Sequence, residues 1–199
     1  MQRLNLDPEE VQQRRERMLA QIDAVFANVT PNDMPAEVAE WCNLAVNGER
    51  RSSLLLMGPT GTGKTHTAIA VTMRLFEVTH LAPRIVTATG MLKSLQPGGG
   101  ATVDRFTTGT QLLVLDDLGA AKITGFKEEV TLEVIDQRYR HRLPTIVTTN
   151  LPGDEMRDVL GDRVVSRLRG MCDTVVFRNT DRRQLEHPPI YVNSTNPNT

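Results

Sequence analysis

The chain has 199 residues, which suits one compact domain with a short extension. Its 23 lysines and arginines nearly balance its 24 aspartates and glutamates, so any contact with nucleic acid must come from a local patch of charge. The two cysteines lack partners at ligand spacing, which argues against a zinc site, and no apolar run approaches the roughly 20 residues of a membrane span, so we expect a cytoplasmic protein without a membrane partner.

The first 33 residues predict an amphipathic helix followed by a linker. Asp7 can cap the helix, and Pro8 suits its first position. Apolar residues then recur on one face to about residue 27, namely Val11, Met18, Leu19, Ile22, Val25 and Phe26. This face either packs on the following domain or enters a groove on a partner protein.

Residues 34–185 predict a single α/β domain. Helices are expected over 35–47, 64–78, 91–95, 126–141, 154–160 and 162–171, and strands over 52–57, 84–87, 112–116, 145–149 and 174–177. Because strands alternate with helices, we expect a parallel sheet covered on both faces. A flexible turn is expected at residues 97–100, and residues 186–199 are expected to be a disordered tail.

The strand over 52–57 leads into a phosphate-binding pattern. The residues are Gly58, Pro59, Thr60, Gly61, Thr62, Gly63, Lys64 and Thr65. Glycines let the backbone wrap closely around phosphate oxygens, and the following helix adds its unpaired N–H groups. Lys64 is expected to reach the β- and γ-phosphates, and the Thr65 hydroxyl to bind Mg²⁺. We group His66 with this binding segment, on the surface of the helix.

The strand over 112–116 ends in Asp116 and Asp117. A buried strand that ends in acids places them at the carboxyl edge of the sheet, where ligands bind in such folds. Asp116 would hold the Mg²⁺ shell, and Asp117 would orient or deprotonate the attacking water. No Asn-Lys-x-Asp sequence follows to read guanine, since no lysine lies beyond Lys127, so we expect ATP rather than GTP.

Two further groups of polar residues are candidates for the site. Asn150 follows the strand over 145–149 and would sit beside the γ-phosphate. Arginines are dense between residues 157 and 183, and Arg163 and Arg167 lie four residues apart on one helix face. By themselves they fit a salt-bridged surface as well as an arginine finger.

Taken in order, these motifs resemble the DnaC/IstB branch of the AAA+ ATPases. The matching segments are residues 58–66, 112–119, 138–139, 144–150 and 161–168. The resemblance implies a five-stranded AAA+ core, without the usual helical lid, that assembles as a ring or spiral. It implies that Asn150 is sensor 1 and that the arginine finger lies at Arg167 or, second, Arg163. It makes Arg183, or Arg182, the candidate for sensor 2.

The resemblance also implies two alternative tasks. The first is loading a hexameric replicative helicase onto single-stranded DNA, and the second is assisting a DNA transposase. A third possibility from a different class is a nucleotide-gated binding module with little turnover. The region before the core is short for a partner-binding domain, and the stretch before Asp116 is compressed around Gly98–Gly100. Lys93, beside these glycines, is our candidate for a DNA contact.

Overall fold

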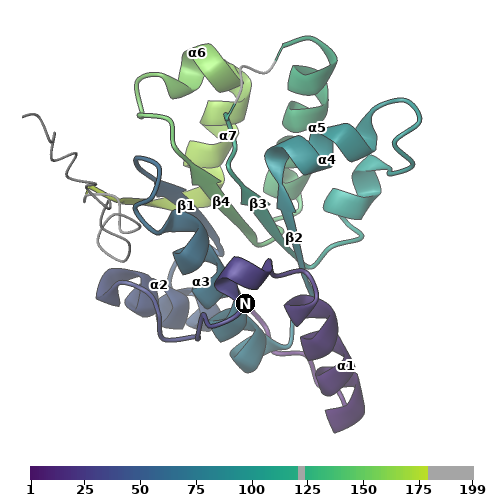
Figure 1. Ribbon diagram of the computed structural model, residues 1–199, viewed down its shortest axis with the longest axis vertical. Helices are drawn as coiled ribbons and strands as arrows, with labels where there is room; N and C mark the ends of the chain where they lie inside the picture. The colour runs from purple at the N-terminus through teal and green to yellow at the C-terminus, as the bar shows by residue number, and fades with distance from the viewer. Residues whose placement is uncertain (121–123, 179–199) are drawn as a thin grey trace, which may run out of the picture.

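The protein is represented by a computed structural model, which describes residues 1–120 and 124–178. Within this part of the chain, five parallel strands form one sheet with helices on both faces (Figure 1). The strands are β1 (Ser53–Met57), β2 (Pro83–Thr87), β3 (Leu112–Asp116), β4 (Thr145–Thr149) and β5 (Cys172–Val176). Their order across the sheet is β2-β3-β4-β1-β5. The predicted parallel five-stranded sheet is therefore confirmed.

The register of the strands brings their carboxyl ends to one edge of the sheet. Met57 lies opposite Thr149 on one side and Val176 on the other, while Thr87 lies opposite Asp116. Since all the strands run in the same direction, the loops that follow β1, β3 and β4 meet at this edge. The phosphate-binding segment, Asp117 and Asn150 therefore lie at this edge.

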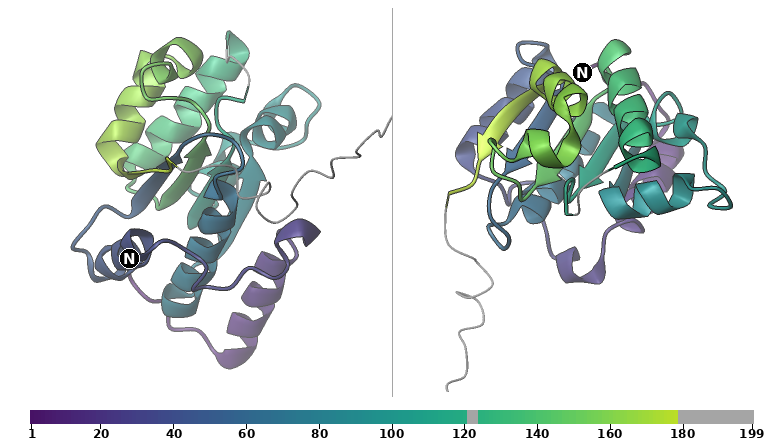
Figure 2. Two further views of the ribbon diagram at one scale, coloured as in Figure 1. Left: turned by 60° about the vertical axis from the view of Figure 1, so that its left-hand side comes forward. Right: turned by 90° about the horizontal axis from the view of Figure 1, so that it is seen from above.

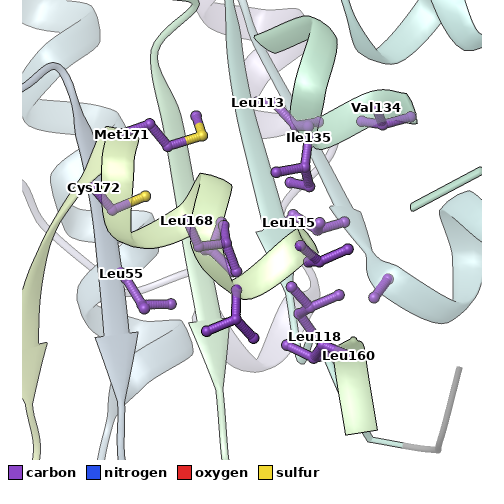
Figure 3. Close-up of a cluster of buried hydrophobic side chains, with 14 of the residues drawn as sticks. Leu55, Leu113, Leu115, Leu118, Val134, Ile135, Leu160, Leu168, Met171 and Cys172 are labelled. Atoms are coloured by element: carbon purple, nitrogen blue, oxygen red, sulfur yellow. The ribbon is translucent and has the colours of Figure 1, made fainter. Parts of the chain in front are cut away.

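Alternate residues of the strands pack into two separate cores, one on each face of the sheet. One face, with Leu54 and Val114, packs on α2 (Ala36–Asn47) and α3 (Lys64–Thr79). The other, with Leu55 and Leu115, packs on α4 (Ala88–Leu95), α5 (Phe126–Arg140), α6 (Met156–Leu160) and α7 (Asp162–Met171). Figure 3 shows the second core, in which apolar side chains of α5 and α7 lie against β1 and β3. The sheet is buried on both faces, which explains its almost continuous apolar strands.

The N-terminal helix α1 (Pro8–Leu19) lies along the outside of α3, as Figure 2 shows in purple. Asp7 caps it as predicted, accepting a hydrogen bond from the Glu10 N–H at 2.8 Å. Met18 and Val29, 3% and 7% exposed, pack in a cluster with Phe76 of α3. In this structure the apolar face of the segment therefore packs on the domain.

The helix expected to reach residue 27 is shorter than predicted, because a tertiary contact ends it. It stops at Leu19, and a single 3₁₀ turn follows at Ala24–Phe26. Gln21 leaves the helix and binds the open edge of β2, accepting from the Ile85 N–H at 3.0 Å and donating to the Pro83 carbonyl at 3.2 Å. Val25, predicted on the apolar face of that helix, lies in the 3₁₀ turn and is 81% exposed.

Two other expectations, the absence of a helical lid and the disordered tail, concern residues 179–199, which lie outside the described residues. Among the residues that the structure does describe, the helices are too short or too polar to cross a membrane.

Arg138 is the largest fully buried side chain in the described part of the fold, and it lies among backbone carbonyls. Its guanidinium donates to the Thr145 hydroxyl at 2.7 Å and to the carbonyls of Phe106, Thr107, Thr110 and Pro144. Burial lowers its pKa to about 9, so the side chain stays charged at neutral pH. It joins α5, the loop before β3 and the start of β4.

We expect Arg138→Met to lower the free energy of unfolding by about 3 kcal/mol or more, because several buried carbonyls lose a charged hydrogen-bond donor. Arg140→Met is the matched control. Arg140 lies two residues away, its side chain is 66% exposed, and its surface ion pair with Asp136 should be worth less than about 1 kcal/mol. Urea unfolding of both variants checks this, and equal midpoints would contradict it.

Candidate nucleotide-binding site

The loop between β1 and α3 has the backbone that phosphate binding requires. Gly61 and Gly63 adopt left-handed conformations, with φ of 82° and 93°. The loop begins at Gly58, whose N–H donates to the Thr149 carbonyl at 3.2 Å. A Cβ on Gly58 would lie 2.4 Å from the Phe177 carbonyl oxygen, so only glycine fits between β4 and the end of β5. Such a run of tight, left-handed residues forms a concave nest of N–H groups that favours anions.

Lys64 begins α3 and reaches back across this loop. Its ammonium donates to the Pro59 carbonyl at 2.7 Å, and the Thr62 hydroxyl donates to the same oxygen at 2.9 Å. The side chain is 8% exposed, so the charge is held inside the loop rather than in solvent. The positive end of the α3 dipole and the ammonium thus act on the same small volume.

Oxygen ligands for a divalent cation gather where α3 faces the end of β3. The Thr65 hydroxyl donates to Asp116 Oδ1 at 2.9 Å, and the Thr148 hydroxyl donates to the same oxygen at 2.6 Å. A hydroxyl and a carboxylate beside a phosphate loop are hard donors of the type that Mg²⁺ prefers. The residues present therefore fit the predicted pair of metal-site residues, Thr65 and Asp116.

Asp117 and Asn150 lie at the same edge of the sheet. Both are exposed, one directly after β3 and the other directly after β4, and these two strands are neighbours. Asp117 has a positive φ of 56°, which is uncommon outside glycine and is tolerated best by aspartate and asparagine. Its N–H donates to the Thr148 hydroxyl at 2.8 Å, which ties this unusual backbone to β4.

A pocket of about 710 Å³ opens beside the phosphate loop. His66 and Thr62 line it together with residues 32–35 of the linker before α2 and residues 175–178 at the end of β5. Hydrogen bonds from Thr30 hold the pKa of Asp33 below its usual value, so this wall of the pocket is anionic. Sequence periodicity could not find these linker residues, because only the fold brings them to the loop.

The two arginines predicted as finger candidates have different surroundings. Arg167 donates to Asp136 at 2.5 Å, and its guanidinium lies 5.1 Å from the centre of the Tyr139 ring. Arg163 is exposed one turn earlier on α7. Both line a groove of about 620 Å³ between α5 and α7, and neither lines the pocket beside the phosphate loop of its own chain. The two sensor 2 candidates, Arg182 and Arg183, lie outside the described residues.

Residues 10–183 match the family model of the IstB-like ATP binding protein. Among curated proteins, the replicative helicase loader DnaC of Escherichia coli (strain K12) is 26% identical over 124 residues, which are 59% of this chain and 50% of DnaC. The predicted ATP-binding protein of insertion sequence IS5376 from Geobacillus stearothermophilus is 29% identical over 122 residues, 59% of this chain and 48% of that protein.

Solved structures support the fold. The crystal structure of the DnaC helicase loader aligns with a TM-score of 0.66 at 21% identity, covering 78% of this chain and all of that one. The crystal structure of DnaI aligns with a TM-score of 0.69 at 18% identity, covering 84% of this chain and all of that one. The chain itself spans about half the length of the curated relatives that it matches.

Proposed function

The chain belongs to the family of IstB-like ATP-binding proteins, and from this premise we propose that it hydrolyses ATP as an oligomer and loads a replicative helicase onto single-stranded DNA. The main support for ATP hydrolysis is that the phosphate loop meets Asp116 and Asp117 at the edge of the sheet. There, Thr65 and the two aspartates stand at one edge of the sheet beside the buried Lys64 ammonium.

Each residue of this junction has a distinct role in the proposal. Lys64 binds the β- and γ-phosphates in place of the Pro59 carbonyl, and the loop N–H groups hold the remaining oxygens. Mg²⁺, held through Thr65 and Asp116, would neutralise phosphate charge. Asp117 orients the attacking water and accepts its proton, and Asn150 positions the γ-phosphate from the neighbouring strand. The pocket lined by His66 accommodates the nucleoside.

Lys64→Ala should abolish ATP binding, whereas Asp117→Asn should keep binding and lose hydrolysis by about 10²-fold or more. Asparagine tolerates the left-handed backbone at this position, so the second variant removes the base without straining the turn. Asp158→Asn, at an exposed carboxylate on α6, is the control. A fluorescent ATP analogue measures binding, and phosphate release measures turnover.

Three outcomes of these measurements differ in meaning. Turnover by Asp117→Asn near the wild-type rate would remove the assignment of the base. Failure of the wild type to bind ATP would remove the ATPase proposal altogether. Tight binding without turnover, with or without DNA, would favour a nucleotide-gated binding module.

For single-stranded DNA, we propose a shallow groove of about 330 Å³ between α4 and the segment after β3. It is lined by Lys93, Lys127 and Gln96, and it also contains Asp117. Two of the chain's four lysines thus stand beside the proposed catalytic base. One such patch is small, so binding should require an ATP-dependent assembly that repeats it.

DNA affinity should therefore depend on ATP and fall with salt, with a log–log slope of about 0.7 for each phosphate neutralised. Lys93→Gln should reduce that slope, because each subunit of the assembly loses one phosphate contact. Arg15→Gln, on the exposed side of α1, should leave it unchanged. Fluorescence anisotropy of labelled oligonucleotides across a salt series checks both, and binding that ignores salt or ATP would contradict the proposal.

A transposition helper is the alternative, supported by the family model and by the insertion-sequence relative. That relative is 29% identical to this chain, a level close to the 26% of DnaC. The two functions differ in partner. Pull-down of the purified chain, with ATP bound, against a replicative helicase and against a transposase encoded near its gene separates them. Capture of the transposase alone would replace the helicase proposal.

A further inference from the structure

Thr148 is a polar residue in the middle of the site to which the sequence motifs assign no role. It lies on β4, two residues before Asn150, and is 1% exposed. Its hydroxyl donates to Asp116 Oδ1 at 2.6 Å and accepts from the Asp117 N–H at 2.8 Å. One buried hydroxyl therefore contacts both of the aspartates on which the proposed chemistry depends.

The contact with Asp116 fixes the orientation of the carboxylate. Thr65 and Thr148 approach it from α3 and β4, two different elements, and both donate to Oδ1. Two donors on one oxygen restrict rotation of the carboxylate, as outer hydrogen bonds do for residues in metal shells. Mg²⁺ bound at this site would take a lone pair of the Thr65 oxygen and leave its O–H free to donate to Asp116, while the Thr148 hydroxyl keeps the same carboxylate in place.

The contact with Asp117 holds a backbone conformation that is unfavourable by itself. A positive φ is unfavourable for a residue with a side chain, and it persists when its surroundings determine it. Here the Asp117 N–H binds the Thr148 hydroxyl, and the next N–H, of Leu118, binds the Thr148 carbonyl at 2.9 Å. The same residue thus fixes two successive peptide groups at the turn after β3.

We propose that Thr148 is a positioning residue that sets the Asp116 carboxylate and the Asp117 backbone together. The expected effect on magnesium and nucleotide binding rests on the proposed ATPase function, whereas the two hydrogen bonds of Thr148 are present without nucleotide. Valine has the shape of threonine without the hydroxyl, so Thr148→Val removes both hydrogen bonds with little change in packing. Thr148→Ser keeps the hydroxyl and removes only a methyl group.

The first measurement is amide hydrogen exchange in the nucleotide-free protein. Thr148→Val should make the Asp117 amide exchange about tenfold faster, since a hydrogen bond of ordinary strength is lost, and Thr148→Ser should leave it near the wild-type rate. The control is Thr72→Val on α3. Thr72 is fully buried, and its hydroxyl donates only to the Ala68 carbonyl at 2.7 Å, away from both aspartates.

The second measurement is a magnesium titration of binding of a fluorescent ATP analogue. Thr148→Val should raise the Mg²⁺ concentration for half-maximal binding by about tenfold, because the carboxylate is no longer held. Thr148→Ser and Thr72→Val should keep the wild-type value. Thr148→Ala, whose smaller side chain fits the same space, replaces the valine variant if the latter does not fold, and it should behave in the same way.

The result that overturns the proposal is specific. If Thr148→Val, or Thr148→Ala, keeps both the Asp117 exchange rate and the Mg²⁺ requirement of the wild type, Thr148 is only a buried strand residue. If Thr148→Val lowers the melting temperature as Thr72→Val does but shifts neither measurement, the conclusion is the same. A wild type that does not bind the nucleotide would refute the ATPase, while the exchange measurement would still test the contact with Asp117.

Discussion

Arg163→Ala should lower the rate of ATP hydrolysis by about 10³–10⁵-fold while leaving ATP binding and folding intact, as expected for an arginine finger. Arg163 is exposed on α7 and does not line the pocket beside its own phosphate loop, so it would act on the nucleotide of a neighbouring subunit. Arg167, the first candidate from the resemblance, is held by Asp136 and Tyr139 of the same chain. We therefore propose that Arg163 is the finger.

Arg167→Ala is the matched comparison, and it should act in a different way. The Arg167 guanidinium holds the pKa of Asp136 below its usual value and fastens α7 to α5. Removing it should loosen this helix pair, so we expect a lower melting temperature and a smaller loss of turnover. Thermal unfolding and phosphate release of the two variants separate the roles. A large loss of turnover in Arg167→Ala alone, with unchanged stability, would return the finger to Arg167.

Mixing two inactive proteins tests whether the finger acts between subunits. Arg163→Ala has an intact pocket and lacks the finger, whereas Lys64→Ala has an intact finger and a pocket that does not bind ATP. Hydrolysis should recover at interfaces where a wild-type pocket faces a wild-type finger. Phosphate release is measured against the mixing ratio, and size-exclusion chromatography verifies co-assembly. No recovery in mixtures that do co-assemble would count against a finger supplied by a neighbour.

Removal of residues 1–30 should destabilise the domain by about 5 kcal/mol or more, at ~1.5–3 kcal/mol for each buried apolar side chain. The deletion would expose the side chains of α3 on which Met18 and Val29 pack, and it would remove Gln21 from the edge of β2. The truncated protein should melt early or aggregate. Calorimetry measures the stability of the truncated protein, and a pull-down measures its binding to the candidate helicase, so the two experiments separate packing on the domain from partner binding.

Point variants make the same test without deleting the chain. Met18→Ala should cost about 2–5 kcal/mol, because Met18 is 3% exposed, whereas Val25→Ala should cost little at 81% exposure. A truncated protein with wild-type stability and ATP binding, but without helicase binding, would show that the segment is a partner-binding hook. Full helicase capture by a stable truncation would remove that alternative.

The sequence by itself determined the features that depend on consecutive residues. The phosphate loop, the threonine that follows it and the two aspartates at the end of β3 are fixed by local backbone geometry, because glycine conformations and strand ends are set within a few residues. The alternation of strands with helices along the chain predicted the parallel sheet covered on both faces. The residue types at these positions also predicted ATP and Mg²⁺ as ligands.

Only the tertiary structure decided which residues distant in the sequence contact one another. Strand order placed Thr148 against both aspartates, although it lies 31 and 32 residues from them along the chain. It ended the first helix early by offering Gln21 the open edge of β2, and it gave Arg167 a partner on α5. Each of these contacts uses a side chain common on any protein surface, so its meaning comes from which element lies opposite. Periodicity and motifs carry no information on that choice, because it is made by the packing of the whole sheet.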